Sequence, residues 1–292
     1  MSVKAGMLIV AVLNLEAGGF DRRHGDHRNL ERLPELIEQE PDVDVLLFLE
    51  GKNYGLQGQS LRYRTENLLA PFGLRSFMTT STIGQIHNLV FVRWPRLRPV
   101  THHKPELPDV NHDQIGWLRF VVDGLDRDLA LRAEHLPFWG GDARLDAAQK
   151  VTRFAAPGVL ALLGGDLNAL WPDCEDHSEF EPDWERLPPH KRHHKTLAPE
   201  LGPDGRPVSD RRATRLLQQA GWVNAGCVAG DMTPTVNDRA DRGHGARIDH
   251  ILLSPDLAPA LVPESYRVWV SDIGDQLSDH RMISAWLDLD QL

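Results

Sequence analysis

Short apolar runs alternate along the chain with stretches in which apolar residues recur every three or four positions. The first run, 7–15 (MLIVAVLNL), is nearly continuous and rich in β-branched residues, a pattern typical of a buried strand. The stretch 26–44 has apolar residues at helical spacing and predicts a helix, with Asp26 as its N-cap and Pro41 at its end. Strand and helix patterns then continue to alternate towards the C-terminus.

The same criteria predict further strands at 43–51, 87–94, 159–168, 247–255, 266–272 and 283–289. They predict further helices at 60–73, 142–155 and 213–221. Residues 117–136 form a predicted hairpin, because two strand patterns flank Asp123-Gly124, which is a good turn signal. This mixture indicates an α/β or α+β sandwich whose sheets are mixed rather than purely parallel.

One long stretch lacks a clear pattern. Residues 171–209 are rich in proline, histidine and charge, and a loop of this length in a compact domain is usually functional or disordered. The chain of 292 residues is long for one domain, but large α/β sandwiches reach this size. With 41% hydrophobic residues it can bury a sizeable core. We expect a single catalytic domain over residues 1–292, with 171–209 as a specificity loop.

Composition narrows the partners and the compartment. The formal net charge of −10 excludes a chain that is basic overall, so a polyanion would have to meet a local basic patch. No convincing cleavage site follows the apolar run 7–13, and no run approaches membrane-spanning length. The two cysteines, Cys174 and Cys227, fit a reducing compartment. We therefore expect a cytoplasmic protein without membrane insertion and without an obligate protein partner.

Several of the predicted strands end in polar side chains. Side chains two positions apart on a strand share a face, so Asn14 points with Glu16, and Asp166 points with Asn168. Further acids and histidines hold comparable places in the pattern: Glu50, His135, Asp249, Asp279 and His280. We expect these side chains to build a polar site at the rim of a sheet.

The order of these segments resembles the endonuclease/exonuclease/phosphatase superfamily. The segments are AVLNLEAG, LLFLEG, LRAEHLP, LLGGDLNA, RIDHILLS and LSDHRMISAWL, and they span about Val10 to Leu289. No segment is decisive alone, but six in this order make a strong signal. The resemblance implies a four-layer α/β/β/α sandwich, in which two mixed sheets pack together with helices outside. It also implies that water attacks a phosphate ester with the help of a divalent cation, Mg²⁺ or Mn²⁺.

Carried over by position, the resemblance implies a role for each polar strand end. Glu50 would bind the metal with Asn14 beside it, and Asp279 would lie at or near it. Asp166 would orient or deprotonate the attacking water. Asn168 would hold Asp166 and touch the phosphate. Elementary chemistry agrees, because Mg²⁺ prefers hard oxygen ligands and lowers the pKa of a bound water.

Two histidines complete the implied site. His280 would hydrogen-bond a phosphate oxygen, and Asp249 would polarise it. His135 matches the position where pancreatic-type deoxyribonucleases and sphingomyelinases place a histidine. Abasic-site endonucleases carry a tyrosine there, which weakens an abasic-site repair interpretation. A histidine held by a carboxylate is fixed in tautomer and stabilised when protonated, so these roles are chemically sound.

Candidate substrate contacts lie outside this core. The densest basic run contains His190, Lys191 and Arg192, which could meet phosphates flanking the scissile one. The alternative is a solvated loop. Arg242 precedes a predicted site strand and is a second candidate for phosphate binding. Trp171 follows another and could stack on a flat group, although such tryptophans more often pack at a rim.

Plainer explanations stand beside several of these assignments. The strand-end Asp and Asn residues, taken singly, are common turn formers, and only the ordered set favours catalysis. Glu16 has an equal claim to be an ordinary exposed glutamate. His250 neighbours Asp249 but should face the other side of its strand, so we expect a packed histidine.

These observations predict a divalent-metal-dependent phosphodiester hydrolase, above all a nuclease acting on DNA or RNA. The acidic net charge favours a short, single-stranded or end-processed substrate, because tight binding to long duplexes rests on phosphate neutralisation. The alternative substrate is a small phosphoester: a nucleotide, a lipid head group or an inositol phosphate. A non-catalytic binding module on the same fold ranks lower, because Glu50, Asp166 and His280 are all present.

Overall fold

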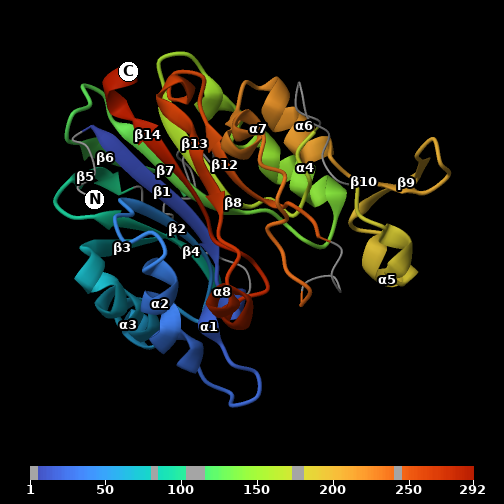
Figure 1. Cartoon of the computed structure of the whole chain (residues 1–292), viewed down its shortest axis with the longest axis horizontal. Helices are drawn as coiled ribbons and strands as arrows, with labels where there is room; N and C mark the ends of the chain where they lie inside the picture. Colours follow the sequence, from blue (N-terminus) through green and yellow to red (C-terminus); the bar gives the residue numbers. More distant parts are fainter. Residues whose placement is uncertain (1–5, 80–84, 103–115, 173–180, 240–244) are drawn as a thin grey trace.

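The computed structural model describes residues 6–79, 85–102, 116–172, 181–239 and 245–292 (Figure 1). Within these ranges two six-stranded mixed sheets pack face to face, and helices lie on their outer faces. The predicted α/β sandwich with mixed sheets is therefore confirmed. A separate two-stranded sheet lies beside it.

The first sheet has the strand order β13-β14-β1-β2-β4-β3. Its strands are β1 (Met7–Asn14), β2 (Val45–Lys52), β3 (Leu74–Thr79), β4 (Ile86–Arg93), β13 (Leu261–Val268) and β14 (Ile283–Asp288). The central strands β1 and β2 pair in parallel, and all other neighbours pair antiparallel. Parallel strands end at the same edge of a sheet, so Asn14 and Glu50 reach one edge together.

The second sheet has the strand order β11-β12-β8-β7-β6-β5. Its strands are β5 (Leu97–His102), β6 (Leu118–Val122), β7 (Leu129–His135), β8 (Leu160–Asp166), β11 (Val223–Asn224) and β12 (Asp249–Leu253). Its central strands β7 and β8 are also parallel, and His135 lies opposite Asp166. The predicted hairpin is confirmed, since β6 and β7 pair antiparallel.

Alternate residues of the central strands face different layers. On β1, Leu8, Val10 and Val12 belong to the apolar cluster between the two sheets. Ile9 and Leu13 point the other way, into the cluster that the first sheet shares with its helices. Both faces of these strands are buried, which explains their nearly continuous apolar sequence.

Helices cover the outer faces of both sheets. Those beside the first sheet are α1 (Glu16–Gly19), α2 (Leu33–Ile37), α3 (Ser60–Leu69) and α8 (Asp272–Leu277). Those beside the second sheet are α4 (Gly141–Gln149) and α6 (Arg212–Gln219). The short helix α7 (Ala225–Ala229) contacts both β12 and β13, and its alanines pack into the cluster between the sheets. Short 3₁₀ turns lie at Arg28–Arg32, Gln57–Gln59, Ala70–Phe72, Thr152–Ala155, Trp184–Arg186, Ala258–Ala260 and Leu289–Gln291.

The predicted single helix within 26–44 is wrong. A 3₁₀ turn covers Arg28–Arg32, and a separate helix, α2, covers only Leu33–Ile37. Pro34 stands in the first turn of α2, where its missing N–H costs nothing, whereas inside a longer helix its ring would clash with the preceding turn. Asp26 does not cap a helix; it accepts a hydrogen bond from the Arg28 amide.

The stretch 171–209 has more structure than its sequence pattern indicates. Its described part contains α5 (Pro189–Arg192) and the two-stranded antiparallel sheet of β9 (Thr196–Leu201) and β10 (Pro207–Ser209). Residues 173–180 lie outside the described ranges. Figure 1 shows these elements as an arm that projects from the sandwich. Arg144 of α4 is buried and connects this arm to the sandwich, because it donates a hydrogen bond to the His194 carbonyl at 2.8 Å.

Two observations bear on the expected compartment. Cys227 of α7 is disulfide-bonded, and the only other cysteine in the sequence, Cys174, lies outside the described residues. The low cysteine count therefore no longer supports a reducing compartment. None of the helices in the described ranges has the length and apolar character that a membrane crossing requires.

Candidate active site

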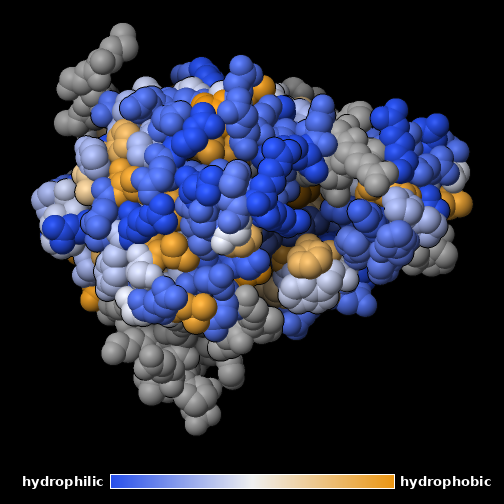
Figure 2. All heavy atoms as spheres, turned by 90° about the horizontal axis from the view of Figure 1, so that it is seen from below, coloured by the Kyte–Doolittle hydropathy of each residue, from blue (hydrophilic) through white to orange (hydrophobic). Residues whose placement is uncertain are grey.

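The central strands of both sheets finish at one place, and their last polar residues meet there. The first sheet contributes Asn14 from β1 and Glu50 from β2. The second contributes His135 from β7 and Asp166 from β8. Seen from this end, the molecule is largely hydrophilic and its surface is hollowed (Figure 2).

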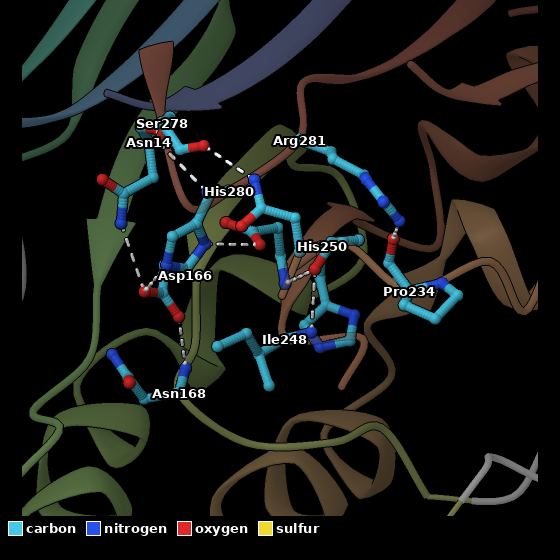
Figure 3. A network of polar contacts seen from close by, with 12 residues as sticks. Asn14, Asp166, Asn168, Pro234, Ile248, His250, Ser278, His280 and Arg281 are labelled. Atoms are coloured by element: carbon cyan, nitrogen blue, oxygen red, sulfur yellow. Dashed lines mark hydrogen bonds and ion pairs between the residues drawn. The ribbon is translucent and has the colours of Figure 1, made fainter. Parts of the chain in front are cut away.

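Asp166 is the hub of the polar contacts (Figure 3). Its side chain is almost fully buried, and its Oδ1 accepts the backbone N–H of Asn168 at 2.8 Å. Its Oδ2 faces three other side chains. Asn14 Nδ2 donates to it at 3.3 Å, and the Nε2 atoms of His135 and His280 lie 3.4 and 3.7 Å away.

These neighbours keep the Asp166 carboxyl ionised. Burial alone would raise its pKa. The charge of His280, the hydrogen bond and charge of His135, and the Asn168 amide outweigh burial and hold the pKa well below its usual range. The centre of the site therefore carries a permanent negative charge at neutral pH.

His280 is held by a second buried carboxylate. Its Nδ1 lies 2.8 Å from Asp249 Oδ2, which directs Nε2 towards Asp166. Burial opposes protonation of this ring, but the charges of Asp249 and Asp166 raise its pKa well above the ordinary value. The pair has the geometry that a carboxylate-polarised histidine requires.

His135 approaches Asp166 from the neighbouring strand of the same sheet, β7. Its Nε2 also lies 3.9 Å from Glu50 Oε1. Burial lowers the pKa of this ring, but the hydrogen bond and charge of Asp166, followed by the charge of Glu50, raise it more. Two histidines whose pKa values are raised thus stand beside the Asp166 carboxylate.

Glu50 is aimed into the site by an irregular strand end. Between Phe48 and Gly51, three steps along β2 match two steps along β4, and Glu50 has a φ of +58° in this bulge. Bulges of this kind re-aim a side chain, often beside a functional site. The Glu50 carboxylate accepts the Ala17 N–H at 2.8 Å and Asn14 Nδ2 at 3.1 Å.

The oxygen atoms around Asn14 fit a hard divalent cation. Asn14 Oδ1 is buried and has no hydrogen-bond partner among the described residues, and the Nδ2 atom of the same amide donates to carboxylate oxygens of Glu50 and Asp166. Asp166, Asp249 and His280 also offer ligand atoms within 4.8 Å of one another. His280 and Asp249 already share a hydrogen bond, however, so the oxygens of Asn14, Glu50 and Asp166 are the ones that could hold a cation.

Asp279 and Asn168 directly adjoin residues of this centre. The Asp279 carbonyl accepts the Asn237 N–H at 3.0 Å, and the Asp279 charge contributes to the raised pKa of the neighbouring His280. Asn168 has a φ of +50°, and its Nδ2 donates to the Leu136 carbonyl at 2.9 Å. Asn168 therefore joins β8 to the segment after β7.

The predicted substrate contacts that lie in the described ranges do not join this cluster. The Trp171 indole is only 1% exposed and packs in the core beneath the second sheet, so it is not placed to stack on a substrate. His190, Lys191 and Arg192 lie on α5, far out on the arm (Figure 1). Arg242 lies outside the described residues.

His250 is a packed histidine, as its strand position predicts. It is fully buried between the Ala169 carbonyl, 3.0 Å from Nε2, and Asn224 Nδ2, 2.9 Å from Nδ1. Burial and the nearby Arg247 lower its pKa to about 3, so the ring is neutral.

Two residues that support the site escaped the sequence analysis. Ser278 Oγ donates to the Asn14 carbonyl at 2.6 Å and accepts the His280 N–H at 3.1 Å, which ties the His280 loop to β1 (Figure 3). Thr235 Oγ1 accepts the Asp249 N–H at 3.0 Å. Ser278 is the first residue of the SDH segment itself, so that segment could have pointed to it, whereas Thr235 has no local signal.

Comparisons with solved structures show the same fold. An AP endonuclease from Archaeoglobus fulgidus is 17% identical, with 96% of this chain and 99% of that chain covered and a TM-score of 0.61. The 3'-5' exonuclease NExo from Neisseria meningitidis is 18% identical, with 96% and 100% covered and a TM-score of 0.58. TDP2 from C. elegans is 18% identical, with 99% and 77% covered and a TM-score of 0.57.

A search of curated proteins found no match. The model of the Endonuclease/Exonuclease/phosphatase family, however, matches residues 11–280, which include the site residues from Asn14 to His280. The chain therefore belongs to the Endonuclease/Exonuclease/phosphatase family.

Proposed function

We propose that this protein is a divalent-metal-dependent phosphodiesterase that acts on nucleic acid. The observation that carries the proposal is the convergence of His135 and His280 on the ionised Asp166, 3.4 and 3.7 Å away, beside the oxygens of Asn14 and Glu50. This set can orient water, bind a phosphate and hold a cation within one small volume.

Asp166 has the position and charge to orient the attacking water. Its low pKa makes it a weak base, so it accepts a hydrogen bond from the water more readily than a full proton. Glu50 and Asn14 would hold the cation, which supplies charge to the phosphate oxygens and acidity to water. We propose Mg²⁺ as this cation, with Mn²⁺ as its substitute.

The two histidines, His135 and His280, would contact the phosphate. Both have raised pKa values, His135 on β7 and His280 in the loop before β14, so a phosphate placed over Asp166 would meet a ring that favours protonation on each side. An in-line displacement at phosphorus needs groups on both sides, and general acid catalysis contributes roughly 10²–10⁴-fold. Asp249 keeps His280 protonated and oriented.

Nucleic acid is the preferred substrate class because of what two proteins of similar fold are described as. Two of its structural neighbours are described as an AP endonuclease and a 3'-5' exonuclease. The second candidate is a small phosphoester, which the net charge of −10 favours over a long polyanion. Both candidates share the chemistry at Asp166.

A substrate panel tests the proposal. Purified protein would be incubated with single-stranded DNA, duplex DNA, RNA and an aryl phosphodiester, in Mg²⁺, in Mn²⁺ and in EDTA. We expect metal-dependent cleavage of a nucleic acid, and Glu50→Gln should raise the Mg²⁺ concentration needed for half-maximal rate about tenfold or more. Cleavage of the aryl ester alone would favour a small phosphoester. Hydrolysis of none of these substrates would contradict the proposal.

A further inference from the structure

A hollow of about 480 Å³ lies beside the candidate active site. Glu16 forms part of its wall, and the amide of the next residue, Ala17, donates to Glu50 at 2.8 Å. The hollow is therefore lined in part by the segment that holds Glu50, the proposed metal ligand. Its other lining residues include Phe20, Arg22, Arg23, Asn29 and Gln276.

The acids around this hollow are already paired. Glu16 forms an ion pair with Arg239, and Asp275 forms one with Arg281 at 3.2 Å. The third acid, Asp21, begins the turn 21–26 that carries Arg22 and Arg23. Its Oδ2 atom lies 2.7 Å from Nδ1 of His24.

Arg22 and Arg23 remain available for a ligand. Both side chains are exposed, and neither makes a hydrogen bond or an ion pair with any residue in the described ranges. Lys52 adds positive charge nearby, since its Nζ lies 5.3 Å from the centre of the Phe20 ring. The Arg22 charge also acts on Glu16 across the wall of the hollow. Two exposed guanidiniums with no hydrogen bond or ion pair in the described ranges, beside the proposed phosphodiesterase site, are suited to bind an anion.

The turn that presents these arginines is closed by backbone hydrogen bonds. The Asp21 N–H donates to the Asp26 carbonyl at 2.7 Å, and the Gly25 N–H donates to the Asp21 carbonyl at 2.8 Å. Gly25 has a φ of +72°, which the tight turn requires. The arginines are therefore held on a defined turn at the rim of the hollow.

We propose that this hollow binds a second phosphate of the substrate, next to the scissile one, through Arg22 and Arg23. The inference rests on the proposed function. Guanidinium groups match phosphate oxygens in a two-pronged geometry, and a hollow of this volume has room for a nucleotide-sized group. The substrate class is then a phosphodiester that carries at least one further phosphate, such as an oligonucleotide or a small polyphosphate ester.

A charge-matched pair of variants tests this site. Arg22→Ala/Arg23→Ala is compared with Arg75→Ala/Arg98→Ala, which removes two exposed arginines from the opposite end of the strands. The substrates are a trinucleotide and bis(4-nitrophenyl) phosphate, which lacks a second phosphate. We expect kcat/KM for the trinucleotide to fall about tenfold in the first variant only, with a salt dependence weaker by about one unit of slope per arginine. Its rate on the aryl diester should stay within about twofold of wild type.

The source of the second phosphate is decided by a third substrate. This substrate is a nucleoside or inositol polyphosphate. If its hydrolysis depends on Arg22 and Arg23 and that of the trinucleotide does not, the second phosphate belongs to a small ligand. If hydrolysis of the trinucleotide depends on them, it belongs to a nucleic acid. An unchanged trinucleotide rate, or an equal loss on the aryl diester, would overturn the inference.

A binding measurement separates this inference from the proposed function. Fluorescence anisotropy would follow a labelled trinucleotide with Asp166→Asn protein in Mg²⁺, with and without the two arginine substitutions. Weaker binding without the arginines, in a protein whose wild type hydrolyses nothing, would support the hollow and contradict the proposed function. If wild type hydrolyses the trinucleotide but its binding does not depend on Arg22 and Arg23, the proposed function would be supported and the inference about the hollow contradicted.

Discussion

Asp166 shows how one side chain acquires a chemical role from its surroundings. Its Oδ1 is fixed by the Asn168 amide, which leaves Oδ2 to face His135, His280 and Asn14. Hydrogen bonds and positive charge keep the carboxyl ionised despite nearly complete burial. An isolated aspartate in the same place would be protonated more readily and would order its neighbours less.

The Asp249 carboxylate should control the protonation of His280. Asp249→Asn keeps the shape but removes the charge that raises the His280 pKa, so fewer rings are protonated at neutral pH. We expect kcat at neutral pH to fall about 10²-fold or more, and to recover partly as the pH is lowered. The measurement is a pH–rate profile beside Asp126→Asn, an exposed control. A uniform loss at every pH would show that Asp249 acts only through structure.

At this scale the sequence predicted the centre of the site better than its surroundings. Asn14, Glu50, His135 and Asp166 end strands, and strand ends can be found from apolar patterns. Trp171 could not be placed, because the direction of a side chain just past a strand depends on packing. Its burial in the core beneath the second sheet has no local cause in the sequence.

At the scale of elements, two parallel strand pairs position the chemistry. The β1–β2 and β7–β8 pairs each occupy the middle of a sheet, and their shared ends meet because the sheets pack face to face. The bulge in β2 then aims Glu50 inward. The site therefore depends on the spacing between the two sheets.

Gly164 of β8 sets part of that spacing. A Cβ at this position would lie 2.6 Å from Val12 Cγ2 and 2.7 Å from Leu47 Cδ1, both on the facing sheet. Gly164→Val should lower the free energy of unfolding by about 1–3 kcal/mol or more, because the sheets must separate. Urea unfolding measures this, with Gly140→Ala as a control at a position with open space. Unchanged stability would contradict this view of the interface.

Predictions of elements failed where proline or tertiary contacts intervene. The helix expected within 26–44 is divided, because Pro34 begins a new helix rather than continuing one. The arm within 171–209 contains a two-stranded sheet whose short strands carry no period-2 pattern of apolar residues. Contacts with the sandwich, such as the one made by Arg144, organise it instead.

For the whole molecule, the charge of the site should appear in the pH dependence of stability. The pKa values of His135 and His280 are raised above the ordinary 6.5, so the folded state holds more protons than the unfolded state above this pH. Without metal, stability should therefore be full below about pH 6.5 and should fall as the pH rises through the folded values. The slope is at most about 1.4 kcal/mol per pH unit for each histidine.

Unfolding in EDTA at pH 6 and pH 8 tests this expectation. In the double variant His135→Gln/His280→Gln the loss of stability between these two pH values should be smaller than in wild type. Equal losses would mean that other groups carry the effect. Asp166 acts in the opposite direction, because its lowered pKa makes its contribution full above about pH 4 and lost only in acid.

The periodicity of apolar residues alone does not determine the strand order of the whole molecule. Apolar patterns located most strands, but they do not say that β14 pairs with β1 across almost the entire chain. The resemblance supplied the two-sheet architecture, and the structure confirms it. The acidic composition likewise hid the arginine turn at Arg22–Arg23, since net charge says nothing about local distribution.

Single-turnover cleavage of a short labelled single-stranded oligonucleotide tests the central claim most directly. Wild type, Asp166→Asn and the exposed control Asp126→Asn would be compared in Mg²⁺, and wild type also in EDTA. The account predicts cleavage in Mg²⁺ by wild type and by the control, none in EDTA, and a rate at least about 10³-fold lower in Asp166→Asn. Cleavage by Asp166→Asn at the wild-type rate, or cleavage that survives EDTA, would contradict it.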